Sequence, residues 1–184
     1  MVSKMTINIA IVTTFLLFGC EKHEDYNHMT SDEIIIRMEK LIKPYDESDV
    51  HKIDFSKIIA PIISNIKNPQ ILADVLIKSY NKRIGINKGN LFFTTLYYNS
   101  LEVDILTALE NINTEASTQV LVELLVNPEM EWDAARALNI RHSVSKCGKK
   151  ALPYLRIVIA GCKDKKECYY DLIKHIENGK IYGL

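Results

Sequence analysis

The sequence has little glycine and proline and no surplus of charge of either sign. Its 184 residues include seven Gly and five Pro, which argues against a loop-rich or fibrous chain. Lys and Arg number 23, and so do Asp and Glu, so no overall field attracts nucleic acid. We therefore expect no nucleic-acid partner. The composition, 47% hydrophobic and 25% charged, is that of an ordinary globular protein.

Common catalytic motifs are also missing. The sequence contains no serine nucleophile elbow, no glycine-rich phosphate loop and no helix with paired metal-binding histidines. His23 and His28 stand near acidic residues, but a polar linker does not fix the geometry that a metal site needs. Carboxylates such as Glu102 and Asp104 are more typical of a solvated helix face than of a glycosidase site. We expect no enzyme activity, no metal and no other cofactor.

The sequence has no apolar run long enough for a permanent membrane span. The most apolar segment, TINIAIVTTFLLF at residues 6–18, follows a start whose only charged side chain is Lys4. As a helix it would extend roughly 20 Å, against ~30 Å for the hydrocarbon core of a bilayer. Its length and basic start instead indicate an export signal.

The end of this run, Leu17-Phe18-Gly19-Cys20, resembles the lipobox of bacterial lipoprotein signal peptides. In that family a small residue precedes a cysteine whose thiol receives a diacylglyceryl group. The signal is then removed, and acyl chains such as palmitate hold the mature protein on a membrane. The resemblance implies cleavage before Cys20 and lipid attachment to it. Phe18 departs from the family pattern, in which a smaller residue is usual. An ordinary signal peptide or an uncleaved anchor is the alternative.

A lipid anchor would fix the location of the protein. Two or three acyl chains anchor a protein effectively permanently, whereas one chain binds only marginally. In enteric-type lipoproteins an aspartate after the modified cysteine favours the inner membrane. This chain has Glu21 there. The resemblance therefore implies the outer membrane, facing the periplasm. We expect residues 1–19 to be the signal peptide and residues 20–30 the lipidated cysteine with a polar tether.

From Thr30 onward, apolar residues recur at helical spacing. Thr30 and Glu33 have the spacing of a capping box, and Pro44 ends the apolar pattern that follows them. Asn68-Pro69 and Asn127-Pro128 are restart signals, because each places proline at a first helical position. Further helices are expected at about 54–66, 69–85, 91–98, 101–112, 114–126, 129–140, 151–161 and 167–178. Residues 91–98 would also suit a strand by composition. No alternating strand pattern is convincing, so residues 31–184 are predicted to be one all-α domain.

The second half of the chain resembles HEAT repeats, in which antiparallel helix pairs stack into a solenoid. Ala108-Leu109 and Ala137-Leu138 lie 29 residues apart, and we place each on the first helix of a pair. WDAARALNI followed by GKKALPYLRIVI carries the resemblance, which covers roughly residues 101–178, with weaker support in 54–98. The connection from Arg141 to Gly148 is longer than the usual turn. Two architectures therefore stay open, a HEAT-like α-α stack and an irregular helical bundle.

Three cysteines remain beside the lipidation candidate. Export would place them in an oxidising compartment. Cys162 and Cys168 flank KDKKE between two helices, so we expect a disulfide there, although counting alone allows three pairings. Cys147 is then left as a free thiol, buried at a helix end. A cysteine nucleophile with His142 or His175 as base is the alternative. We instead expect His142 to lie near the end of a helix and His175 at a buried boundary.

Aromatic residues are the candidates for a binding surface. They comprise Trp132, the pair Tyr169 and Tyr170, and the pair Tyr97 and Tyr98, because aromatics are enriched at interaction hot spots. The alternative is that they pack in the core. These observations favour a lipid-anchored protein-interaction module of the cell envelope, of immunity, inhibitor or assembly type. The competing hypotheses are an envelope hydrolase with an unrecognised active site and a lipoprotein that binds a small ligand or metal.

Overall fold

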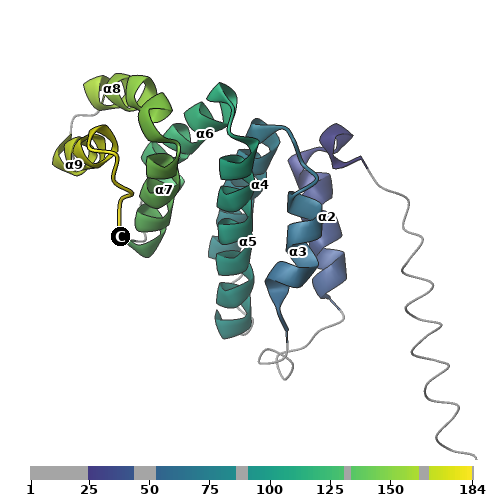
Figure 1. Ribbon diagram of the computed structural model, residues 1–184. Helices are drawn as coiled ribbons and strands as arrows, with labels where there is room; N and C mark the ends of the chain where they lie inside the picture. Colours follow the sequence, from purple (N-terminus) through teal and green to yellow (C-terminus); the bar gives the residue numbers. More distant parts are fainter. Residues whose placement is uncertain (1–24, 44–52, 86–90, 131–133, 162–165, 184) are drawn as a thin grey trace, which may run out of the picture.

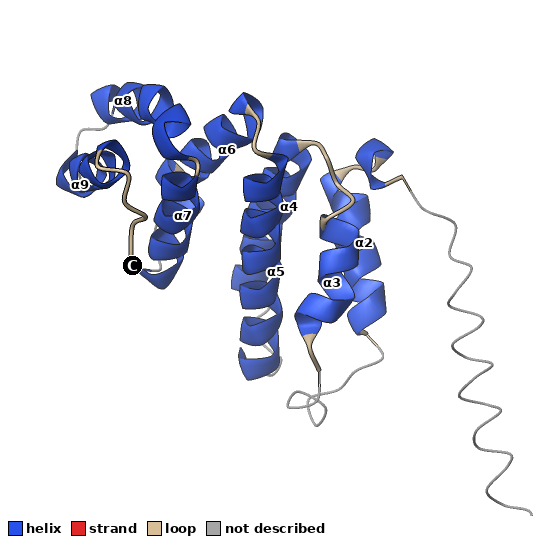
Figure 2. Ribbon diagram, viewed as in Figure 1, coloured by secondary structure: helices blue, strands red, loops and turns tan. Residues whose placement is uncertain are grey.

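The computed structural model describes residues 25–43, 53–85, 91–130, 134–161 and 166–183, without the side chains of 82–94, 129, 134–135 and 166–168. Regular structure in these ranges is entirely helical, as predicted (Figures 1 and 2). The elements are η1 (Tyr26–His28), α2 (Ser31–Ile42), α3 (Phe55–Ile63), α4 (Pro69–Gly85), α5 (Leu91–Ile112), α6 (Glu115–Val126), η3 (Pro128–Met130), α7 (Ala134–Lys146), η4 (Gly148–Ala151), α8 (Leu152–Gly161) and α9 (Lys166–Glu177).

Several helices begin where the sequence places a capping side chain. The Thr30 side chain accepts a hydrogen bond from the Glu33 amide, and the Glu33 carboxylate accepts one from the Thr30 amide, which confirms the capping box. Thr114 and Ser117 form the same reciprocal pair at the start of α6. The Asp54 side chain caps α3 by accepting from the Lys57 amide. These bonds satisfy amide donors that the first turn of a helix would otherwise leave free.

Two predicted boundaries are wrong. The segments 91–98 and 101–112 form one continuous helix, α5, with no break between them. The helix expected at 129–140 begins instead at Ala134 and continues to Lys146, so the predicted long connection from Arg141 to Gly148 is mostly helix. The turn between α7 and α8 is therefore shorter than predicted. The long connection that distinguished this segment from a HEAT-like pattern is absent.

The helices pack as two layers of antiparallel pairs. α2, α4, α6 and α8 follow one another in one layer, and α3, α5, α7 and α9 follow in the other. Each helix of the first layer also packs on its successor in the chain, which gives four pairs from α2–α3 to α8–α9 (Figure 1). Each pair buries its apolar face against the next, as in repeat proteins that are stable only as stacks. The packing is compatible with the predicted α-α stack.

The phase of the repeat differs from our prediction. α5 and α7, which carry the two Ala-Leu dipeptides, are the second helices of their pairs rather than the first. Leu109 is fully buried, whereas Leu138 is 45% exposed. The 29-residue spacing therefore does not relate equivalent core positions.

One apolar core runs through the stack. Its largest fully buried side chains come from the five helices α2 to α6 and the turn after α3: Ile34, Met38, Ile59, Ile63, Ile66, Leu72, Leu76, Leu101, Ile105, Leu109, Leu121 and Leu124. Burying one such side chain contributes about 1.5–3 kcal/mol. The core is continuous from α2 to α9 and therefore fixes where the polar groups described next can lie.

Candidate functional site

A carboxylate lies inside the stack, on α5 between α4 and α7. Glu102 is 3% exposed and Arg136 of α7 is 8% exposed. One oxygen of Glu102 accepts from Arg136 Nε at 3.3 Å and from the Tyr80 hydroxyl of α4. The other accepts from Asn139 Nδ2 at 3.0 Å. A buried charge is tolerated only when it is paired and hydrogen-bonded, and both oxygens here meet that condition.

Tyr80 contacts both Arg136 and Glu102. The Arg136 guanidinium lies over the Tyr80 ring, with Cζ 3.3 Å from the ring centroid, in a cation–π contact. Burial raises the pKa of Tyr80, and the nearby Glu102 charge raises it further. The hydroxyl therefore stays protonated and donates to the carboxylate. Tyr80 also stacks on Tyr98 of α5, with 6.5 Å between centroids.

This group, which we call the Glu102 cluster (Tyr80, Glu102, Arg136 and Asn139), links three helices from both layers. Glu102 was expected on a solvated helix face, and that prediction is wrong. The donors come from α4 and α7, far from Glu102 in sequence, so local spacing carries no sign of them. Because the charged and hydroxyl groups bind one another, the cluster has the properties of an internal structural link. It offers no free acid or base to a substrate.

Asp104, two residues farther along α5, has a different environment. Its Oδ1 accepts from the Ser56 hydroxyl of α3 at 2.7 Å, while Oδ2 is buried without a hydrogen-bond partner among the described residues. Burial raises the pKa of Asp104, the Ser56 hydrogen bond opposes this, and the charge of Asp54 adds to the rise. Glu102 and Asp104 therefore contact different neighbours and do not form one site.

Most of the aromatic binding candidates are core residues. Tyr97 and Tyr98 are 7% and 4% exposed, and their rings lie 4.9 Å apart, so this pair packs in the core, which was the alternative to a binding surface. Tyr169 is 3% exposed and also belongs to the core. Tyr170 is 51% exposed and lines a shallow hollow on α9. Trp132 lies outside the described residues.

Cys147 is a free thiol, as predicted, at the turn between α7 and η4. It is half-buried, and its Sγ donates to the Ser143 carbonyl at 3.5 Å. Burial raises the pKa of the Cys147 thiol, which disfavours the reactive thiolate. Cys20 and Cys162 lie outside the described residues, and the side chain of Cys168 is not described. The disulfide stays a prediction.

The two histidines bind the C-terminal segment. His142 Nδ1 lies 2.9 Å from the Tyr182 carbonyl oxygen, and the Tyr182 amide donates to Ser145 Oγ at 2.9 Å. The ring of His175 lies 5.1 Å from the ring of Tyr182. His142 was expected near a helix end but lies one turn inside α7. His175 is partly buried, as expected. Both imidazoles therefore serve the packing of the chain end on α7 and α9.

No three His, Cys, Asp or Glu side chains of the described part gather as a group that would hold a metal. None of the described helices is both long and apolar enough to cross a membrane. Neither a family model, a curated protein nor a solved structure matches this chain.

Proposed function

We propose that this protein is anchored by lipid to the bacterial cell envelope and binds another protein through its helical stack. The observation that supports the anchor is Leu17-Phe18-Gly19-Cys20 at the end of a short apolar run with a basic start. The lipid on Cys20 would hold the chain on the outer membrane, facing the periplasm. The partner is a toxin or hydrolase that the protein neutralises, or a component of an envelope assembly.

The start of the folded body supports a short tether. Asp25, five residues after Cys20, caps η1 by accepting from the Asn27 amide. Asn27 is in turn tied to the α3–α4 turn, because its Oδ1 accepts from the Lys67 amide at 2.6 Å and its Nδ2 donates to the Asn65 carbonyl. The described part of the fold therefore reaches to within five residues of the proposed anchor, which would hold the domain close to the membrane.

The distribution of charge and apolar surface supports binding over catalysis. The buried charges of the Glu102 cluster are used within the fold. Large apolar side chains are instead exposed along the stack, from Ile36 of α2 at 48% through Val103 of α5 at 53% to Ile157 of α8 at 72%. Repeat-like stacks present extended surfaces to other chains, and these exposed side chains are the apolar positions such a contact could use.

Detergent-phase partition with labelled palmitate tests the anchor. The wild-type chain, expressed in a diderm bacterium, should enter the detergent phase and carry the label. Cys20→Ser should lose both properties, while Cys147→Ser should keep both and thus controls for the loss of a thiol. An unlabelled wild-type chain in the aqueous phase would contradict the proposal.

Site-specific photo-crosslinking in living cells tests the interaction. A photoreactive residue replaces Ile157 or Tyr170 at the C-terminal end, and the exposed Lys57 of α3 serves as the control position. We expect one discrete adduct from the terminal pair and none from the control. Equal adduct patterns at all three positions would indicate random collisions and would contradict a specific interface.

A further inference from the structure

The last described residues of the chain leave α9 and return onto the stack. Gly179 follows the end of α9 with φ +67°, a conformation that favours glycine because it has no Cβ. The Lys180 amide then donates to the His175 carbonyl at 2.8 Å, which closes the end of the helix. Residues 180–183, which we call the C-terminal segment, continue outside any helix and end beside α7 (Figure 1).

Two side chains of α7 bind the main chain of one residue in this segment. His142 Nδ1 lies 2.9 Å from the Tyr182 carbonyl oxygen, and because a carbonyl only accepts, this nitrogen carries the hydrogen. The Tyr182 amide donates to Ser145 Oγ at 2.9 Å. Ser145 donates its own hydrogen to the His142 carbonyl at 2.7 Å, which leaves its oxygen free to accept. His142 and Ser145 thus form a donor and an acceptor, three residues apart on one helix, that suit any peptide unit with an N–H and a C=O.

The same site also contacts the side chain of Tyr182. The ring packs against the His175 imidazole, with 5.1 Å between the centroids, and the Arg141 guanidinium lies 5.9 Å from the ring centroid. Both contacts favour an aromatic side chain at this position. We call the four residues Arg141, His142, Ser145 and His175 the tail site. Its geometry therefore suits one peptide unit, outside a helix, that carries an aromatic ring.

The C-terminal segment is held by few contacts. Lys180, Ile181 and Gly183 are exposed, and both hydrogen bonds to the tail site come from Tyr182, which is itself only half-buried. Arg141 Nε is buried and has no hydrogen-bond partner among the described residues, which disfavours the occupied arrangement. Terminal segments with few buried contacts open at a small fraction of the global stability. We therefore expect the segment to leave the tail site without unfolding of the stack.

We propose that the tail site binds a tyrosine-bearing segment of the protein partner, and that the C-terminal segment occupies the site until the partner displaces it. This inference rests on the proposed function and adds where the partner binds and which side chain it presents. The seated segment of the chain itself shows the chemistry that the site accepts.

A second copy of this chain is the competing occupant. It offers the same segment as the chain's own, whose local concentration at the site is roughly millimolar because it is tethered there. A second copy therefore gains nothing from the tail site alone, whereas a different protein can add contacts to the surface beside it. Leu138 of α7 supplies such a surface, since it is 45% exposed and its Cδ1 lies 3.5 Å from the position of a Cβ on Gly183.

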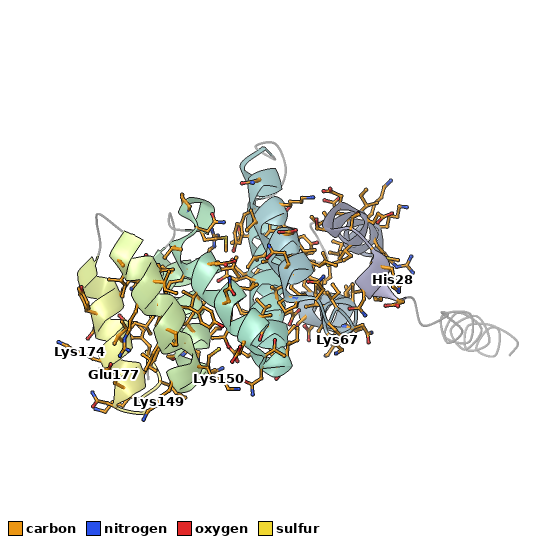
Figure 3. The ribbon with its side chains drawn as sticks, turned by 90° about the horizontal axis from the view of Figure 1, so that it is seen from above. His28, Lys67, Lys149, Lys150, Lys174 and Glu177 are labelled. Atoms are coloured by element: carbon orange, nitrogen blue, oxygen red, sulfur yellow. The ribbon has the colours of Figure 1, made fainter. Side chains whose placement is uncertain are left out.

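The location of α9 leaves the tail site open to a partner. Seen from above in Figure 3, Lys174 and Glu177 of α9 lie at one end of the stack, and His28 lies at the other. His28 belongs to the first described element, which directly follows the proposed tether. The tail site is therefore at the end of the stack away from the proposed anchor.

Binding of a synthetic peptide to the full chain tests whether the site can exchange its occupant. The probe is a fluorescent peptide of residues 178–184, and its affinity is measured by fluorescence anisotropy. Tyr182→Ala should bind the probe at least about tenfold more tightly than wild type, because the C-terminal segment fills the site in most wild-type molecules. Ile181→Ala, a change at the exposed neighbour, should behave like wild type. Equal affinities of Tyr182→Ala and wild type, or no binding to Tyr182→Ala, would overturn the proposal.

A second probe checks the chemistry that the site recognises. The same peptide with alanine in place of tyrosine should bind Tyr182→Ala at least about tenfold more weakly than the original probe, because it lacks the ring that His175 and Arg141 contact. Equal binding of the two peptides would contradict recognition of a tyrosine. Circular dichroism of each variant shows that the helices remain folded.

Photo-crosslinking from Leu138 in living cells tests the partner at this site. We expect an adduct with another protein whose yield rises several-fold in Tyr182→Ala, where the site is empty, and stays unchanged in Ile181→Ala. A yield that does not respond to Tyr182→Ala, or an adduct between two copies of this chain, would overturn the proposal. Adducts from Ile157 without one from Leu138 would refute the tail site alone, while the absence of adducts from both positions would refute the proposed interaction itself.

Discussion

The guanidinium of Arg136 lies directly over the ring of Tyr80, with 3.3 Å between Cζ and the ring centroid. The same guanidinium donates to Glu102, to which the Tyr80 hydroxyl also donates. One cation thus joins α7 to both α4 and α5. The link lies where the second and third helix pairs meet, so we expect it to control how firmly the two halves of the stack hold together.

Arg136→Met should destabilise the fold strongly. The change leaves Glu102 buried with its charge unpaired, a situation that typically costs about 3–5 kcal/mol. Denaturant unfolding followed by circular dichroism measures the loss. Arg156→Met is the control, because Arg156 pairs with Glu177 on the exposed surface, where such pairs contribute about 0–1 kcal/mol. Similar losses in the two variants would show that burial of the Glu102 cluster is unimportant.

Removing both charges should do less damage than removing one. In Glu102→Gln/Arg136→Met no buried charge remains without a partner, so we expect the double variant to recover at least about 1 kcal/mol relative to Arg136→Met. The four proteins of this cycle are compared by the same unfolding experiment. Additive losses would contradict a direct coupling between the two side chains.

Tyr80→Phe should destabilise by about 1–3 kcal/mol, because it removes a donor from a buried carboxylate without creating a large cavity. Tyr170→Phe removes a hydroxyl from an exposed residue and should change the unfolding free energy little. Equal unfolding free energies for Tyr80→Phe and Tyr170→Phe would show that the hydrogen bond from the Tyr80 hydroxyl does not stabilise the buried Glu102 carboxylate.

Asp104→Asn should stabilise the protein at neutral pH. The folded pKa of Asp104 is raised, so its contribution to stability is full below the unfolded pKa, near 3.9, and is lost as pH rises through the folded pKa. The amide of Asn does not ionise and so avoids this loss. We expect the free energy of unfolding to rise by at most about 1 kcal/mol, because Asp104 is only partly buried. Thermal unfolding as a function of pH should show the gain at pH 7 and none near pH 3. A gain that persists at low pH would contradict the charge as its cause.

Cys147 should react slowly with thiol reagents in the folded protein. Burial raises the pKa of its thiol, so its rate at pH 8 should lie below that of the same residue in urea, where the chain is unfolded. Mass spectrometry of the labelled peptide identifies the site. Faster reaction in the folded state would instead indicate an activated cysteine and would revive the nucleophile hypothesis.

The local features of this fold could be predicted from the sequence. Thr30 and Glu33 stand three residues apart, and a capping box needs nothing beyond that spacing. The Glu102 cluster could not be predicted in this way, because its partners lie 22, 34 and 37 residues away on other helices. A carboxylate in a helical pattern carries no local sign of whether a neighbouring helix supplies an arginine.

Adjacent aromatic residues show the same limit. Tyr169 and Tyr170 follow each other on α9, where successive side chains point about 100° apart, so one can face the core while the other faces solvent. The sequence pattern does not reveal which one is buried until the packing of α9 on α8 and α7 is known. In the structure Tyr169 is buried and Tyr170 is exposed, so of this pair only Tyr170 remains a candidate for binding.

The mass of the N-terminal peptide of the mature protein tests the central claim most directly. After purification from bacterial membranes and proteolysis, the account predicts a peptide that begins at Cys20 and carries the added mass of a diacylglyceryl group and an acyl chain. A peptide that begins at Cys20 without lipid, or one that still contains residues 1–19, would contradict it.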